Sequence, residues 1–281
     1  MESVERCPAC GASPLLSAGG LARCRACGLA RAEEPCFSEP RYGGLDEREI
    51  YSLSKSRIIT ELVSDLSAFR PGGGRLLDVG CASGEIMKAA ASAGWDCSGV
   101  EISPRLAAEA SAAGFPVHAG RLETLRTPDS SFDAVAFYDV LSLVEDPRPL
   151  LARAFALLRP GGAVFIRELN AAFHLRALAL SGLPPLRALG LRPGVVHNWN
   201  YTPAAMRAFL RSSGFEGIRL RNSRPTSGDP YATGGRLGAA AVGIFKSAFF
   251  AAARAAGVLS GGRVLAASAF AAAAFKPGGQ R

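Results

Sequence analysis

The sequence is poor in lysine: only four of its 32 basic residues are lysines, and all the others are arginines. Basic residues outnumber the 24 acidic ones, which leaves a formal net charge of +8. This excess either reflects a codon bias toward Arg, Ala and Gly, or favours an anionic partner such as a nucleotide, a phospholipid surface or RNA. The basic residues are scattered, and no basic stripe is interleaved with aromatic residues. The pattern therefore argues against a nucleic-acid partner.

Long hydrophobic runs are also missing. The most apolar stretch, residues 237–259, is interrupted by Lys246 and Arg254 and consists largely of Ala and Gly. A membrane-spanning helix needs roughly 20 strongly apolar residues, so we expect none. No secretory leader is visible before the first cysteine, and we expect a cytoplasmic protein. Residues 236–257 could pack on the body, join two copies in a homodimer, or lie peripherally on the inner face of the membrane.

Seven cysteines are present, and four of them form two Cys-x-x-Cys pairs, Cys7 with Cys10 and Cys24 with Cys27. In a reducing compartment, paired thiols bind metal more often than they form disulfides, and the thioredoxin-like context of a redox pair is absent. Four thiolates suit a tetrahedral Zn²⁺ ion, with an iron–sulfur cluster as the alternative. Because all four ligands are protein groups, the predicted zinc site is structural and would stabilise a small ribbon.

Strand and helix patterns alternate from residue 75 onward. The predicted strands are 75–79, 97–101, 115–119, 132–138 and 163–168, and the predicted helices between them are 85–94, 104–114 and 147–162. This rhythm predicts an α/β fold with a parallel, Rossmann-like sheet and helices on both faces. Helical patterns are also predicted over 45–69, over 171–191 and from Pro203 onward, with a strand at 216–221 and an edge strand at 271–275.

The turn after the first strand reads LLDVGCASG, residues 76–84. Gly80 and Gly84 lack Cβ atoms, so a ligand can approach the backbone closely, and the helix that follows offers unsatisfied N–H groups. Glu101 ends the second strand, 23 residues after Asp78, where a carboxylate can accept both hydroxyls of a ribose. These residues predict an adenosine-containing cofactor. The alternative is a structural turn followed by a surface glutamate.

These residues resemble the class I S-adenosylmethionine-dependent methyltransferases. LDVGCASG (77–84) resembles the first motif of that family, and GVEIS (99–103) resembles its ribose-binding strand end. FDAV (132–135), LVEDP (143–147) and LLRPGG (157–162) resemble its later motifs in the same order. The resemblance covers roughly residues 70–170. It implies a seven-stranded, mostly parallel sheet whose last strand is antiparallel, and S-adenosyl-L-methionine as the cofactor.

The resemblance also implies which residues hold that cofactor. The Gly80–Gly84 loop would hold the methionine part, Glu101 the ribose, and Ile102 and Leu122 the adenine. Members of the family often carry an acidic or amide side chain after the third strand, whereas this chain has Arg121 there. The predicted cofactor-binding residues are Asp78, Gly80, Cys81, Ala82, Gly84, Glu101, Ile102, Leu122 and Tyr138.

Methyl transfer is a displacement at a sulfonium carbon, so its main demand is alignment of donor and acceptor. A base helps when the acceptor is a hydroxyl or an amine. The predicted catalytic residues are Tyr138 and Asp139 after the fourth strand, Glu168 after the fifth, and His197 in HNWNYTP (197–203). His197 would act either as the base or as a side chain that fixes its loop. The other two histidines lie in a predicted strand and a predicted helix, and we expect structural roles for them.

The predicted organisation is a zinc-ribbon module (1–40), a linker and entrance helix (41–74) and a methyltransferase domain (75–281) with helical insertions near 171–195 and 230–262. The predicted function is methylation of a small molecule, such as a sugar, a glycan or another secondary metabolite. Two alternatives remain open at this point: an rRNA base methyltransferase, and a non-catalytic scaffold that keeps the cofactor fold.

Overall fold

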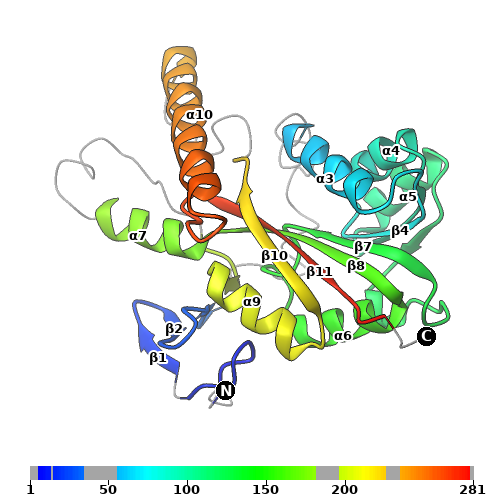
Figure 1. Ribbon diagram of the computed structural model, residues 1–281, viewed down its shortest axis with the longest axis horizontal. Coiled ribbons are helices and arrows are strands. Elements are labelled where there is room, and N and C mark those ends of the chain that lie inside the picture. Colours follow the sequence, from blue (N-terminus) through cyan, green and yellow to red (C-terminus); the bar gives the residue numbers. More distant parts are fainter. Residues whose placement is uncertain (1–5, 14, 35–55, 182–195, 226–234, 279–281) are drawn as a thin grey trace.

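The computed structural model (Figure 1) is organised around a central seven-stranded sheet with the strand order β10-β11-β8-β7-β4-β5-β6. The structure describes residues 6–13, 15–34, 56–181, 196–225 and 235–278. The strands of this sheet are β4 (Arg75–Val79), β5 (Asp96–Glu101), β6 (Val117–Ala119), β7 (Phe132–Tyr138), β8 (Leu158–Leu169), β10 (Glu216–Ser223) and β11 (Ala269–Phe275). Neighbours from β6 to β8 pair in parallel, and β11 runs antiparallel to both of its neighbours. The predicted Rossmann-like, mostly parallel sheet is confirmed.

The prediction that residues 271–275 form an edge strand is wrong. β11 lies between β8 and β10, and the edge strand is β10. The sequence of β11, AFAAAAF, is rich in alanine, which has a weak strand propensity. Ala269, Phe270 and Ala274 are completely buried, so pairing on both sides and burial outweigh that propensity.

Helices cover both faces of the sheet. On one face, α3 (Ser56–Phe69), α4 (Glu85–Ser92) and α5 (Pro104–Ala112) form one core cluster with alternate sheet residues. On the other face, α6 (Pro147–Leu157) and α9 (Pro203–Ser212) form a second cluster. Side chains cap three helices: Ser103, Asp146 and Thr202 each accept a backbone N–H of the first turn. Each cap precedes a proline at the helix start, which explains why these helices begin where the sequence predicts.

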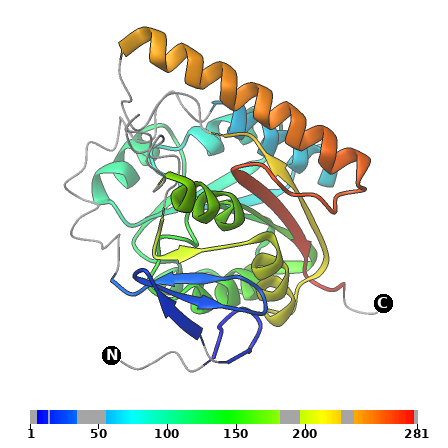
Figure 2. The ribbon, with the colours of Figure 1, turned by 90° about the vertical axis from the view of Figure 1, so that its left-hand side faces the viewer.

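The N-terminal strands form a small second sheet whose fourth strand comes from far along the chain. β1 (Leu15–Ala18), β2 (Leu21–Cys24) and β3 (Ala30–Ala32) pair antiparallel, and β3 then pairs with β9 (Trp199–Asn200). β9 comes from the segment just before α9. Figure 2 shows the blue N-terminal strands against the yellow segment that contains β9 and α9. The N-terminal strands are therefore joined to the later part of the chain by main-chain pairing across some 170 residues of sequence.

The remaining elements are a short 3₁₀ helix, η1 (Leu122–Thr124), and two helices in the predicted insertions, α7 (Ala171–Ser181) and α10 (Gly235–Leu259). Parts of the predicted entrance segment and insertions lie outside the described residues. These parts are residues 41–55 of the entrance segment, and residues 182–195 and 226–234 in and beside the two insertions. Among the helices of the described chain, none is long and apolar enough to cross a membrane. The three-part division of the chain stays a prediction.

Candidate functional site

The four paired cysteines converge in the N-terminal ribbon. Their sulfur atoms all lie within 4.8 Å of one another, and the Cys7–Cys27 and Cys10–Cys24 sulfur pairs are each 3.6 Å apart. A tetrahedral zinc ion with bonds of about 2.3 Å holds its sulfurs about 3.8 Å apart. The cluster could therefore bind zinc with little rearrangement. Within the described residues, no other group of three or more Cys, His or acidic side chains has metal-binding geometry.

Each cysteine pair lies on the same kind of tight turn. The Cys7 N–H donates to the Ala12 carbonyl and the Gly11 N–H donates to the Cys7 carbonyl, both at 2.8 Å, and the second pair repeats this pattern. Gly11 and Gly28 have φ values of +73° and +76°, in the left-handed region that favours glycine. These turns direct all four thiols toward one point.

The ribbon contacts the segment that carries His197. The Thr202 hydroxyl donates to the Cys27 carbonyl at 2.6 Å, and the Ala32 N–H donates to the Asn198 carbonyl at 2.9 Å. A Cβ atom on Gly28 would lie 3.0 Å from the Thr202 methyl group, so the two chains pack closely. The metal-binding turn therefore lies directly against the start of α9.

His197 is held by hydrogen bonds at its backbone and its ring. Asn200 accepts the His197 N–H at 3.0 Å and donates to the His197 carbonyl at 2.7 Å. The ring Nδ1 lies 3.0 Å from the hydroxyl oxygen of Ser142. Burial lowers the pKa of His197 from its usual value, so the imidazole is neutral at pH 7 and can accept a proton. Ser142 therefore positions the ring and Asn200 positions its backbone, and the sequence reasoning missed both residues.

Glu168, on β8, lies beneath the loop that contains Ser142. Its side chain is completely buried, and its Oε1 atom accepts the Ser142 N–H at 3.1 Å. Burial, followed by the charge of Asp139, raises the pKa of Glu168 to about 8. Glu168 therefore carries a proton at pH 7. Its Oε1 atom holds the backbone of Ser142, and its predicted catalytic role stays a prediction.

Asp139 and Tyr138 end strand β7 beside these groups. Asp139 has a φ of +60°, which is unusual for a residue with a side chain, and it forms an ion pair with the fully buried Arg167. Strained backbone of this kind is concentrated at functional sites. Burial raises the pKa of Tyr138, so its phenol stays neutral. Arg167, another residue that the sequence reasoning missed, fixes the carboxylate of Asp139 at the edge of the sheet.

The glycine loop and Glu101 form a cradle at the ends of β4 and β5. Gly80 has a φ of +73°, and a Cβ atom there would lie 2.6 Å from the Val140 side chain. Gly84 caps α4 with a φ of +91°, which directs the first N–H groups of that helix toward the loop. The buried Glu101 carboxylate accepts the Ala82 and Ser103 N–H groups, each at 2.9 Å. This backbone-lined cradle fits the predicted cofactor.

The other predicted cofactor contacts are placed differently. Ile102 exposes 44% of its surface beside Glu101, as expected for a residue that covers an aromatic base. Leu122 exposes only 1% and packs in the core, so its side chain offers no surface to a ligand. Asp78 is buried at the end of β4, and the thiol of Cys81 packs beneath Gly99. The roles of Ile102, Leu122, Asp78 and Cys81 in cofactor binding stay predictions.

The two remaining histidines have structural partners. His118 lies 2.9 Å from the Thr124 hydroxyl, and the ring of His174 lies 2.9 Å from the Ser268 carbonyl. Burial lowers the pKa of His174 to about 4, so this ring is neutral and donates to that carbonyl. His174 thereby ties α7 to the segment before β11.

Comparisons with known proteins agree with this architecture. A family model described as a methyltransferase domain matches residues 51–220. The ubiquinone biosynthesis O-methyltransferase of Xanthomonas axonopodis pv. citri (strain 306) is 30% identical over 178 residues, which cover 60% of this chain and 72% of that protein. A second relative of the same name, from Xanthomonas campestris pv. campestris (strain B100), is 31% identical over 149 residues, covering 50% of this chain and 62% of that protein.

Solved structures share the fold at low sequence identity. A SAM-dependent methyltransferase from Archaeoglobus fulgidus superposes with a TM-score of 0.54 at 17% identity, covering 82% of this chain and 98% of that one. Phosphoethanolamine N-methyltransferase 2 of Haemonchus contortus was solved with phosphomonomethylethanolamine and S-adenosylhomocysteine. It superposes with a TM-score of 0.52 at 20% identity, covering 78% of this chain and 52% of that one. The chain belongs to the methyltransferase domain family and is an S-adenosylmethionine-dependent methyltransferase.

Proposed function

We propose that this protein methylates a hydroxyl oxygen of a small-molecule acceptor, and that His197 accepts the hydroxyl proton. The observation that supports this most directly is the neutral, partly buried His197, whose ring contacts Ser142 and whose backbone is held by Asn200. Similarity to O-methyltransferases at 30% identity supports oxygen as the methylated atom. The acceptor class remains the one that the sequence predicts: a sugar, a glycan or another secondary metabolite.

When bound, S-adenosylmethionine supplies a methyl group on a positively charged sulfur. The residues of this chain then have three roles. Glu101 and the loop at Gly80 hold the cofactor, and Asp139 with Arg167 shapes the floor of the acceptor space. His197 accepts the proton at Nε2 when its Nδ1 hydrogen is donated to Ser142. The acceptor oxygen gains the methyl carbon as the carbon–sulfur bond breaks, and the electron pair of that bond stays on sulfur.

Replacing His197 by Ala is expected to lower kcat by about 10²- to 10⁴-fold, the range typical of a lost general base. The dissociation constant for S-adenosylmethionine, measured by calorimetry, should stay unchanged. His118→Ala is the matched control because His118 lies on β6 and contacts Thr124 instead. Full turnover of His197→Ala at saturating acceptor would remove His197 as the base.

The pH dependence of the rate tests the same assignment. Because burial lowers the pKa of His197, the wild-type rate should fall only when the pH drops below the usual histidine value of 6.5. Ser142→Ala should move this acid limb and reduce kcat, since the ring loses its partner at Nδ1. An acid limb that is identical in wild type and Ser142→Ala would contradict the proposed role of Ser142.

The alternative functions make different predictions. An rRNA base methyltransferase would shift in an electrophoretic assay with RNA at moderate salt. A non-catalytic scaffold would bind S-adenosylmethionine but would not turn it over. We favour the enzyme because the cradle residues and the His197 hydrogen bonds occur together in one chain.

We also propose that α10 makes a peripheral contact with the inner face of the membrane. Its Phe250 and Ala253 pack inward, while Ile244, Val258 and Leu259 expose 72%, 72% and 89% of their surfaces. Exposed apolar residues on a protein with a net charge of +8 suit an anionic lipid surface. The protein should cosediment with anionic liposomes, and an Ile244→Asp/Leu259→Asp variant should do so less. Unchanged cosedimentation would contradict the contact, and a doubled mass in light scattering would favour a homodimer through this helix.

A further inference from the structure

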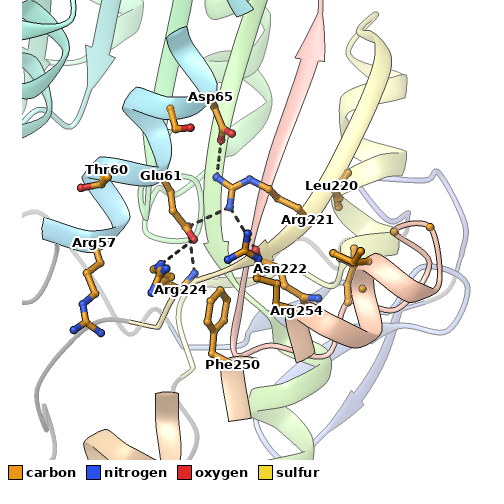
Figure 3. Close-up of a pocket in the computed structure, with 16 residues that line it drawn as sticks. Arg57, Thr60, Glu61, Asp65, Leu220, Arg221, Asn222, Arg224, Phe250 and Arg254 are labelled. Atoms are coloured by element: carbon orange, nitrogen blue, oxygen red, sulfur yellow. Dashed lines mark hydrogen bonds and ion pairs between the residues drawn. The ribbon is translucent and has the colours of Figure 1, made fainter. Parts of the chain in front are cut away.

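A cavity of about 800 Å³ lies between α3, β10 and α10 (Figure 3). Its volume falls within the range of small-molecule sites, roughly 300–1,000 Å³. Six of its lining residues carry charge: four arginines, Arg57, Arg221, Arg224 and Arg254, and two acids, Glu61 and Asp65. Four positive and two negative charges leave a net charge of +2 on its walls. A cavity of this kind favours an anionic ligand.

Ion pairs hold two of the arginines, Arg221 and Arg224, in place as one wall of the cavity. Arg221 pairs with Asp65 at 2.6 Å and with Glu61 at 3.2 Å. Arg224 lies 3.5 Å from the other oxygen of Glu61, and its guanidinium stacks over Phe250 at 5.4 Å. Figure 3 shows this network extending from α3 to β10. The network neutralises both acids of the cavity.

The other two arginines supply the excess charge. Arg57 on α3 and Arg254 on α10 are both exposed, and neither forms an ion pair with any residue that the structure describes. They approach the cavity from different helices. Guanidinium groups recognise phosphate through paired N–H donors, which makes arginine well suited to this role. Leu220, Phe250 and Leu265 add an apolar part to the lining.

The cavity adjoins the methyl-transfer edge of the sheet. The guanidinium of Arg167, which pairs with Asp139, also donates to the Arg224 carbonyl at 3.0 Å. The charges of Asp65, Arg221 and Glu61 act on the Tyr138 phenol at the end of β7. The backbone of Arg224, which lines the cavity, is thus one hydrogen bond away from the Arg167–Asp139 pair.

From this arrangement we propose that the cavity between α3, β10 and α10 binds a phosphate or diphosphate group carried by the methyl acceptor. This inference rests on the proposed function and narrows its acceptor to a phosphorylated small molecule. Arg57 and Arg254 bind the anion, and the fixed Arg221–Arg224 wall shapes the cavity. The apolar residues contact the part of the acceptor that joins the phosphate to the methylated hydroxyl.

Calorimetric titration of the full chain with inorganic pyrophosphate tests the proposal. The protein is loaded with zinc and saturated with S-adenosylhomocysteine, so that the cofactor site is filled. Wild type should bind pyrophosphate, and Arg57→Ala/Arg254→Ala should bind it at least about tenfold more weakly, because two charged donors are lost. Arg105→Ala, which removes an exposed arginine from α5, is the matched control and should bind as wild type does. Inorganic phosphate in a second titration shows whether one phosphate group suffices.

Each outcome separates the cavity from the cofactor site. Pyrophosphate binding that is equal in wild type and in the double variant means an adventitious ion only, and it overturns the proposal, as does the absence of binding. S-adenosylhomocysteine is titrated separately into both proteins and should bind them equally. Failure of wild type to bind S-adenosylhomocysteine would count against the proposed function, whereas failure with pyrophosphate alone would count against the cavity.

Discussion

Removal of the metal from the four-cysteine cluster is expected to lower methyl transfer by about 10²-fold or more, a loss in the range expected when a general base is missing. The reason is geometric: the turn of Cys27 holds the Thr202 hydroxyl, and strand β3 pairs with β9 next to His197. Structural zinc sites contribute about 10–16 kcal/mol of binding free energy in small peptides, so the ribbon should unfold without the ion. Strand β9 would then lose its partner.

Two measurements besides activity check this prediction. Limited proteolysis should cut the ribbon after chelation, and the fluorescence of Trp199 should change because its ring is buried under Arg31 at 5.5 Å. Binding of S-adenosylmethionine should persist, since the cradle belongs to β4, α4 and β5. Cys10→Ser should reproduce the effect of chelation, and Cys97→Ala, which removes a core thiol outside the cluster, should not. Metal-free protein with unchanged proteolysis and turnover would contradict the coupling.

Replacement of Glu101 by Ala is expected to weaken S-adenosylmethionine binding by about 100-fold or more. Its carboxylate accepts the Ala82 and Ser103 N–H groups and is predicted to accept the ribose hydroxyls as well. Hydrogen bonds to a charged group contribute about 1.5–3 kcal/mol each, and every 1.4 kcal/mol changes a binding constant tenfold. Loss of the carboxylate also releases the loop that the two N–H groups hold. Calorimetric titration gives the affinity directly.

The matched control is Glu109→Ala on α5, whose carboxylate pairs with Arg105 at the surface. This variant should bind the cofactor as wild type does. A Glu101→Ala protein that keeps wild-type affinity and wild-type thermal stability would show that Glu101 neither binds the ribose nor holds the loop. Reduced stability with unchanged affinity would assign to it only the structural role.

Much of the fold could be predicted because it depends on local patterns. The strands at 75–79 and 132–138 are short apolar runs between turn residues, and the structure has both with the predicted bounds. The cradle could be predicted for the same reason, since Gly80 and Gly84 serve backbone conformations that few other residues adopt. The central position of β11 could not, because its alanines give a weak local signal and their burial depends on strands far away in sequence.

The residues around His197 also include some that the sequence predicts and some that it does not. His197 could be singled out from its position, but Ser142, Asn200 and Arg167 could not, because hydrogen bonds between distant residues leave no spacing in the sequence. Burial also changed the reading of Glu168. Desolvation raises the pKa of this carboxyl to about 8, and no spacing in the sequence encodes that burial.

The sequence by itself determined the sheet, the glycine cradle and the convergence of four cysteines, because each follows from residue types at short spacing. Only the tertiary structure decided where the cysteine ribbon lies. Pairing of β3 with β9, and the bond from Thr202 to the Cys27 carbonyl, place the predicted metal site directly behind the loop of His197. Main-chain pairing between residues 30–31 and 199–200 depends on how the whole chain packs, and no local pattern encodes it.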